Sequence, residues 1–186
     1  MELEKIRQKI EARIGKKRME HTYRVMETAE KLATIYNVDV EKVKTAAFLH
    51  DCAKMKDRKD LIRAANHYDM LLTKEMKKAP QIIHAYLGAL IAEREYHIKD
   101  EDILNGIQYH TTGRENMSDL EKIIFLADYM EPKRNFPGVE KARELAEKDL
   151  NEAMLYALTQ TIHHLLDSNE VIALDTIKAR NYLLEK

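Results

Sequence analysis

The sequence has few of the residues that break helices or cross-link chains. Its 186 residues include 5 Gly, 3 Pro and 1 Cys, and no Trp. So few turn-forming residues cannot supply the many chain reversals of an all-β fold. Ala, Leu, Glu and Lys are plentiful, so we expect an all-α protein. The single cysteine, Cys52, excludes an intramolecular disulfide.

Long apolar runs and an excess of one charge are also missing. No stretch approaches the roughly 20 apolar residues of a transmembrane helix, and the charged first residues, MELEK, lack the apolar core of a signal peptide. Lys and Arg number 31 against 32 Asp and Glu, so no protein-wide field attracts nucleic acid or an anionic membrane. We therefore expect a cytoplasmic protein without membrane contact or strong nucleic-acid binding.

Hydrophobic residues recur at helical spacing along most of the chain. The first predicted helix is closed by Gly15, the second carries His21, and the third is capped by Asp39 and carries His50 and Asp51. Pro80 opens the next helix, Asp100 caps the one that carries His110, and a Ser118–Glu121 capping box begins another. Further helices are predicted over about 139–167 and 176–185. Residues 54–79 are charged and weakly periodic. We expect them to form a flap or mobile connection with a short helix near 60–66.

A histidine followed directly by an aspartate, His50 and Asp51, stands where an apolar helical stripe should run. Both side chains ligate metals, and both are costly to bury without a partner. Four further candidate ligands occupy inward positions of other predicted helices: His21, His84, His110 and Asp128. Without a metal each of the six needs its own hydrogen-bond solution, whereas one or two shared cations satisfy all of them. Imidazole and carboxylate donors without thiolate suit iron, manganese, cobalt or zinc.

The remaining histidines and the cysteine do not fit this pattern. We expect surface or packing roles for four of them: His67, His97, His163 and His164. Cys52 follows Asp51, but its helical direction turns it away from the site, which favours a buried thiol over a nucleophile.

Basic residues flank the candidate ligands. Lys54 lies about one helical turn after Asp51, Arg18 nearly one turn before His21, and Arg134 just beyond the helix of Asp128. Around a metal cavity such residues suit phosphate oxygens, which a guanidinium binds bidentately. The sequence has no Walker A motif and no dinucleotide-binding glycine fingerprint. We therefore expect phosphate to be held by metal and side chains.

Taken together, these positions resemble a known family. His21, the His50–Asp51 pair and Asp128 reproduce the H…HD…D signature of HD-domain metal-dependent phosphohydrolases, and the two other candidate histidines match the extra histidines of its dinuclear members. Longer segments also match: HAYLGA at 84–89, HTTG at 110–113, MSDLEKIIFLADYMEP at 117–132 and FPGV at 136–139. They resemble the bacterial YqeK-type HD proteins, the symmetrical bis(5'-nucleosyl)-tetraphosphatases.

The resemblance implies one helical HD domain over residues 1–186, with a metal-binding core at about 18–132 and C-terminal helices at 139–185. It implies iron as the metal, as one or two ions, and diadenosine tetraphosphate (Ap4A) as the substrate, cleaved to two ADP. The implied nucleotide contacts are Arg18, Lys54, His84, His110, Thr111, Arg134 and the 171–176 segment with Thr176.

The corresponding mechanistic hypothesis is attack of a metal-bound hydroxide on an inner phosphate. We expect one metal on His21, His50, Asp51 and Asp128, with Asp51 bridging to a second metal on His84 and His110. Lys54 would offset charge on the phosphate oxygens. If a single metal binds, His84 or His110 would instead contact phosphate or protonate the leaving group. Asp51, His84, His110 and Lys54 are therefore the candidate catalytic residues.

Several alternatives remain open from the sequence. Another HD phosphohydrolase would act on a nucleoside di- or triphosphate, a cyclic nucleotide or an alarmone. A di-iron HD site can also support oxygenation, although the basic residues argue against it. A third reading is a binding module in which the metal only stabilises the fold. A homodimer also remains open.

Overall fold

The computed structural model describes residues 3–185, with side chains from residue 6, and this range is built from helices without a strand. The elements are α1 (Leu3–Ile14), α2 (Lys16–Ile35), α3 (Val40–Leu49), α4 (Arg58–His67), α5 (Lys74–Lys78), a 3₁₀ turn η1 (Pro80–Ile82), α6 (Ile83–Tyr96), α7 (Glu101–Tyr109), α8 (Asp119–Met130), α9 (Val139–Ala146), α10 (Leu150–Asp167) and α11 (Leu174–Leu184). The all-α prediction is confirmed. Within the described range no helix is both long and apolar enough to cross a membrane.

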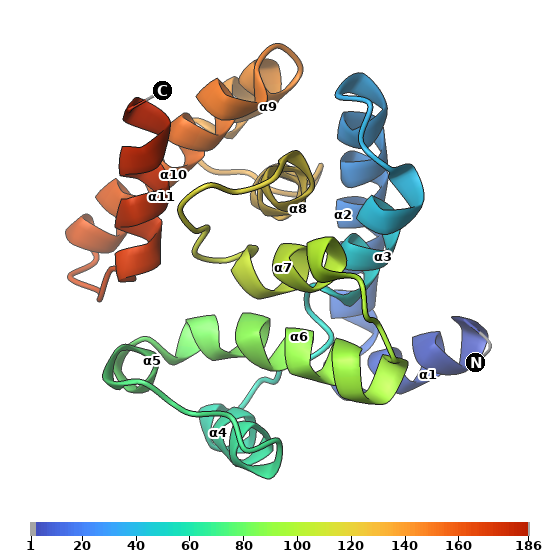
Figure 1. Ribbon diagram of the computed structural model, residues 1–186. Coiled ribbons are helices and arrows are strands. Elements are labelled where there is room, and N and C mark those ends of the chain that lie inside the picture. The colour runs from blue at the N-terminus through green and yellow to red at the C-terminus, as the bar shows by residue number, and fades with distance from the viewer. Residues whose placement is uncertain (1–2, 186) are drawn as a thin grey trace.

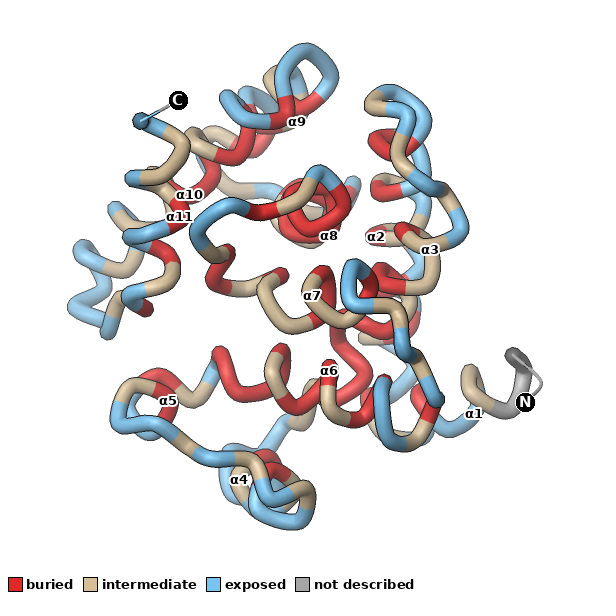
Figure 2. The backbone as a smooth tube through the Cα atoms, in the orientation of Figure 1, coloured by how far each residue is buried: buried red, intermediate tan, exposed pale blue. Residues whose placement is uncertain are grey.

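Helix α8 lies at the centre of the molecule. It packs against α2 and α3 on one side, against α7, and against α9 and α10 on the other side (Figure 1). Figure 2 shows α8 buried over most of its length, and Ile123, Ile124 and Leu126 are each fully buried. A helix that is apolar on all sides belongs in the core. Its C-terminal end therefore carries Asp128 into the interior.

Three predicted helix starts are confirmed by their caps. The side chain of Asp39 accepts from the backbone N–H groups of Glu41 and Lys42, and Asp100 caps α7 in the same way. Ser118 and Glu121 form the reciprocal capping box of α8. These bonds satisfy backbone donors that the first turn of a helix leaves free.

Two helices end earlier than the sequence predicted. α3 stops at Leu49 and α7 at Tyr109, so His50, Asp51 and His110 follow these helices instead of lying within them. After Leu49 the chain continues in tight turns, with Cys52 N–H donating to Leu49 O (3.0 Å). Apolar periodicity shows which way a side chain points, but it does not show where the backbone leaves the helix. The inward direction was predicted correctly, because all three side chains are buried.

Residues 54–79 contain more helix than expected. α4 corresponds to the predicted short helix, and α5 adds a second one. The C-cap of α4 is bound to α6, because Arg94 Nη1 donates to Tyr68 O (3.0 Å) and the Tyr68 hydroxyl donates to Glu95. The predicted 139–167 region is divided into α9 and α10, since Asp149 starts a new helix as its N-cap.

Gly138, just before α9, provides a stability prediction. Its φ is +91°, and a Cβ there would overlap the hydroxyl of Tyr156. Gly15 has a similar φ of +81° but open space around it. We expect Gly15→Ala to cost about 1–3 kcal/mol, because its backbone (φ +81°, ψ 158°) lies in a region almost confined to glycine. Gly138→Ala adds the overlap with Tyr156 to the strain of a left-handed backbone (φ +91°, ψ −3°), so we expect it to cost more. Urea unfolding measures both, and equal losses would contradict the steric argument.

Candidate metal centre

The six imidazole and carboxyl groups singled out from the sequence lie together in the interior. Their ligand atoms form three overlapping groups, each within 4.8 Å: His21, His50 and Asp51; His50, His110 and Asp128; Asp51, His84 and His110. These residues come from α2, α6, α8 and the turns after α3 and α7. Five of the six are buried, and the side chain of Asp128 is 19% exposed. The centre is therefore open to solvent on the Asp128 side.

Asp51 lies between two pairs of histidines. Its Oδ2 is 3.4 Å from His50 Nε2 and 3.8 Å from His21 Nε2. Its Oδ1 is 3.1 Å from His84 Nε2 and 3.9 Å from His110 Nε2. Each carboxylate oxygen thus faces a different pair of ring nitrogens. The carboxylate therefore offers one oxygen to each pair of rings.

The same nitrogen of each ring, Nε2, faces the centre. Three of the rings direct Nδ1 to the carbonyl oxygen three residues earlier: His50 to Ala47 (2.6 Å), His84 to Gln81 (2.6 Å) and His110 to Ile107 (2.7 Å). A carbonyl oxygen can only accept, so Nδ1 carries the proton in these rings. In a neutral ring Nε2 is then left with a lone pair, which is the form that ligates metals.

The centre therefore brings acceptors together. His21 Nε2, His50 Nε2 and both carboxylate oxygens of Asp51 are buried without a hydrogen bond, although Asp51 Oδ2 forms an ion pair with Arg18. Buried lone pairs without donors are costly, and a cation among them removes the cost. These donors fit a divalent metal cofactor.

The charge states agree with this reading. Burial alone would raise the pKa of Asp51, but His50 and His84 hold it well below its usual range. Asp128 behaves in the same way, with its pKa held down by the neighbouring imidazoles. Burial, with the charges of neighbouring histidines, lowers the pKa of His110 to about 3, so this ring is neutral at pH 7. For His50, the charge of Asp51 outweighs burial and raises the pKa. The His50 ring therefore attracts a cation, whether proton or metal.

Three basic side chains border the centre. Arg18 Nε is 2.6 Å from Asp51 Oδ2, and Arg134 Nη2 is 2.7 Å from Asp128 Oδ1. Lys54 Nζ lies 3.2 Å from His84 Nε2, and burial lowers its pKa. The structure therefore brings all three predicted cations to the ligand cluster. Positive charge here favours an anionic ligand.

The two threonines differ in their relation to the centre. Thr111 directly follows His110, and its Oγ1 is buried without a hydrogen-bond partner. Thr176 is buried in the first turn of α11. The hydroxyl of Tyr86, on α6, donates to Asp175, on α11 (3.1 Å), and so links the two helices. Thr111 is thus next to a candidate ligand in the chain, whereas Thr176 lies on a helix that contacts α6, the helix of His84.

Sequence reasoning missed Glu131, the C-cap of α8. Its side chain is buried and contacts His21 Nδ1 (3.3 Å), and it accepts from Arg24 Nε (2.6 Å). These contacts, with burial opposing them, lower the pKa of Glu131 to about 2. The available signal was its position three residues after Asp128, nearly one turn further along the same inward face.

The groups assigned to other roles lie away from the centre. The four histidines outside the pattern are exposed, as predicted: His67, His97, His163 and His164. Cys52 is fully buried, and its Sγ donates to Gly88 O at 3.5 Å. The prediction of a buried thiol is confirmed.

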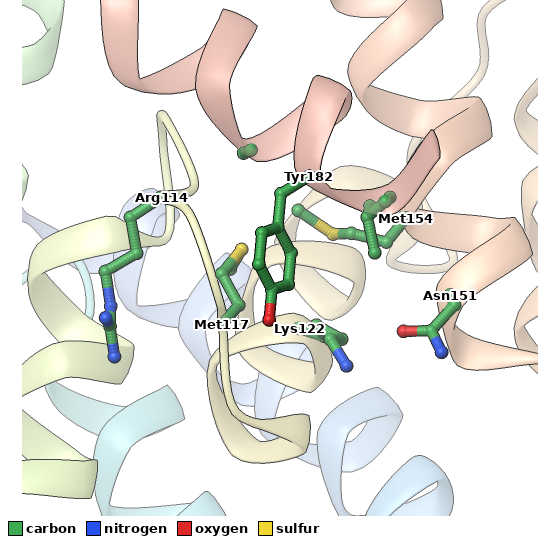
Figure 3. A pocket seen from close by; sticks show the side chains of 8 residues that line it. Arg114, Met117, Lys122, Asn151, Met154 and Tyr182 are labelled. Atoms are coloured by element: carbon green, nitrogen blue, oxygen red, sulfur yellow. The ribbon is translucent and has the colours of Figure 1, made fainter. Parts of the chain in front are cut away.

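A separate hollow lies between α11, α10 and the connection from α7 to α8. Figure 3 shows Tyr182 reaching into it between Met117 and Met154, with Arg114 and Lys122 at its edges. Its volume is about 10 Å³. That is roughly the space of one water molecule. This hollow is too small for a nucleotide and contains none of the predicted site residues.

Comparison with known proteins defines the class. Residues 18–133, more than half of the chain, match the HD domain family. The chain therefore belongs to the HD domain family, as the H…HD…D signature predicted.

More similar relatives cover nearly the whole chain. It is 45% identical over 181 residues to the symmetrical bis(5'-nucleosyl)-tetraphosphatase of Halalkalibacterium halodurans, covering 95% of this chain and 94% of that protein. The enzyme of the same name from Bacillus subtilis is 39% identical over 170 residues, 88% of each chain. A crystal structure of a predicted HD superfamily hydrolase involved in NAD metabolism from Clostridium acetobutylicum superimposes with a TM-score of 0.94 at 41% identity, over 100% of this chain and 98% of that one. The resemblance inferred from the sequence is confirmed.

Proposed function

We propose that this protein is a metal-dependent phosphohydrolase that cleaves Ap4A symmetrically to two ADP. The observation that carries the proposal is the near full-length similarity to two symmetrical tetraphosphatases. A buried cluster of metal-ligand side chains and three bordering cations supports it, because a polyphosphate needs both. No separate observation favours a different nucleotide substrate.

The proposed ligands form two sets that share one carboxylate. One metal would be held by His21, His50, Asp51 and Asp128, and a second by Asp51, His84 and His110. Support comes from the two oxygens of Asp51, each of which faces one pair of imidazoles. A bound divalent metal lowers the pKa of water and so supplies a nucleophile at neutral pH. If one metal suffices, His84 and His110 are free to contact phosphate or to protonate the leaving group.

The remaining side chains would bind and orient the substrate. Arg18, Lys54 and Arg134 would offset charge on the phosphate oxygens, since they border the centre. Thr111, next to His110 in the chain, has a hydroxyl without a hydrogen-bond partner and would contact the substrate, and Thr176 would contact the nucleoside from α11. Symmetrical cleavage requires attack at an inner phosphorus. Water oxygen then bonds to that phosphorus as the bridging oxygen leaves, and each product is ADP.

Three finer points belong to the same proposal. The metal is iron, as the resemblance to the symmetrical tetraphosphatases implies; the imidazole and carboxylate donors suit it, as they also suit manganese, cobalt or zinc. The chain folds as one HD domain, with a metal-binding core at about 18–132 and C-terminal helices at 139–185. It works in the cytoplasm, since a single cysteine cannot form the intramolecular disulfides that are typical of proteins in oxidising compartments. A homodimer remains open, and exposed Leu166 and Leu174, at the adjacent ends of α10 and α11, offer apolar surface for one.

Product analysis tests the proposed function. We expect the protein, loaded anaerobically with ferrous iron and given Ap4A, to form ADP as the only nucleotide product. Turnover without oxygen would exclude an oxygenase. AMP together with ATP would show asymmetrical cleavage, which contradicts the proposed register. Turnover of a nucleoside triphosphate, cyclic nucleotide or alarmone in place of Ap4A would favour another HD phosphohydrolase. If none of these compounds is hydrolysed, the result would favour a binding module.

A further inference from the structure

Glu131 lies behind the metal centre, on the far side of the His21 ring. It is 3% exposed, and both carboxylate oxygens are engaged. Oε1 faces His21 Nδ1 at 3.3 Å, while Oε2 accepts from Arg24 Nε (2.6 Å) and from the backbone N–H of Lys133 (2.8 Å). Since its oxygens are occupied in this way, Glu131 supports a ligand instead of serving as one.

His21 needs this support more than the other three histidines do. Their Nδ1 atoms donate to the chain's own carbonyl oxygens three residues earlier. His21 lies within α2, where the carbonyl three residues earlier, that of Arg18, accepts from the Thr22 hydroxyl (3.2 Å). The partner of its Nδ1 is therefore a side chain, Glu131, which a substitution can remove.

We propose that Glu131 is a positioning residue for the metal centre. By accepting the Nδ1 proton of His21, it keeps the Nε2 lone pair for a metal, which Asp128 (3.0 Å from Nε2) and Asp51 (3.8 Å) would share. Carboxylates behind a histidine ligand fix its tautomer and make it a better donor. This inference rests on the proposed metal ligands and is independent of the substrate.

The same residue connects the ligand to a bordering arginine. The backbone carbonyl of Glu131 accepts from Arg134 N–H (2.8 Å), and its side chain accepts from Lys133 N–H. This turn places the Arg134 guanidinium on Asp128. Removing the Glu131 side chain should therefore make both the turn at Lys133 and Arg134 and the orientation of the His21 ring less fixed.

The test compares a variant without the acceptor with one that keeps it. Glu131→Met fills similar space but leaves His21 Nδ1 without an oxygen, whereas Glu131→Gln retains an amide oxygen. Nitrogen-15 NMR of the histidine rings in the protein without added metal reports the tautomer, and competition with a chelator measures ferrous iron affinity. We expect Glu131→Met to give mixed His21 tautomers and roughly ten- to a hundredfold weaker iron binding. Glu131→Gln should keep the Nδ1–H tautomer and most of the affinity.

A matched control lies at the other end of the same helix. Glu121 is also buried, and it is paired with Arg114 at 2.6 and 2.7 Å, remote from the centre. Glu121→Gln should lower the unfolding temperature without changing iron affinity or the His21 tautomer. Neither measurement involves Ap4A, so a wrong substrate assignment would leave this test intact.

Two results would overturn the proposal. One is a Glu131→Met protein that keeps the wild-type tautomer, and the other is equal iron affinity in the Met and Gln variants. Because Glu131→Met leaves Arg24 without its charge partner, the variant is compared with the double variant Arg24→Met/Glu131→Met, which buries no unpaired charge. If the single variant does not fold, the double variant decides by the same two measurements.

Discussion

Asp51→Asn should abolish Ap4A hydrolysis, with a loss of roughly a thousandfold or more, since even one electrostatic group in an active site is worth about 10² to 10³ in rate. Asp51 is the group that faces both pairs of imidazoles, so its loss affects every proposed metal position. The amide can donate hydrogen to one of the facing nitrogens, and we therefore expect the variant to remain folded. Metal content by mass spectrometry should fall with the activity.

A matched exposed carboxylate serves as the control for this variant. Asp60 lies on α4 and pairs with Arg63 at the surface, with side chains 57% and 80% exposed. Asp60→Asn should leave metal content and rate unchanged. An Asp51→Asn protein that retained both its metal and its hydrolysis would contradict the proposed ligand set.

Arg134→Ala should lower kcat/KM for Ap4A by roughly a hundredfold, the effect of removing one charged contact to a reacting phosphate. Arg134 already lies at the centre, 2.7 Å from Asp128, and its Nε donates to the Asp128 carbonyl oxygen at 2.9 Å. Arg134→Lys should recover only part of the loss, because an ammonium lacks the planar pair of donors. Steady-state kinetics on all three proteins measures the effect.

Metal content separates two explanations for a loss in Arg134→Ala. If the arginine acts on substrate, iron binding should persist while kcat/KM falls. If the variant loses its iron, the arginine acts by holding Asp128 in position and not by binding substrate. Arg63→Ala, which removes an exposed arginine from α4, should change neither quantity.

Much of the fold was predictable because helical periodicity and caps are local. The interiors of α2, α6 and α8, and the caps at Asp39, Asp100 and Ser118, follow from residues within a few positions of one another. The ends of α3 and α7 were not predictable in this way. Inward side chains continue past the last helical residue, so the pattern of polarity does not change where the backbone does.

The candidate site was predictable for a different reason. Six inward polar groups are hard to explain singly, so their convergence could be expected before any distance was known. Glu131 was missed because a glutamate beside a proline at a helix end has the composition of an ordinary surface loop. Its burial depends on Arg24, which lies 107 positions away in the chain. The inward position of Glu131 after Asp128 is a local signal of burial, but no local pattern identifies Arg24 as its partner.

The backbone contacts of three imidazoles have a consequence for how this protein tolerates mutation. The Nδ1 atoms of three histidines donate to backbone carbonyl oxygens, which every amino acid supplies whatever its side chain; these are His50, His84 and His110. Substitutions at Ala47, Gln81 or Ile107 can therefore change the packing around a ring without removing the carbonyl oxygen that accepts its Nδ1 proton. A centre built on such scaffolding is robust over evolutionary time, and its one brace open to loss by a single codon change is the carboxylate behind His21.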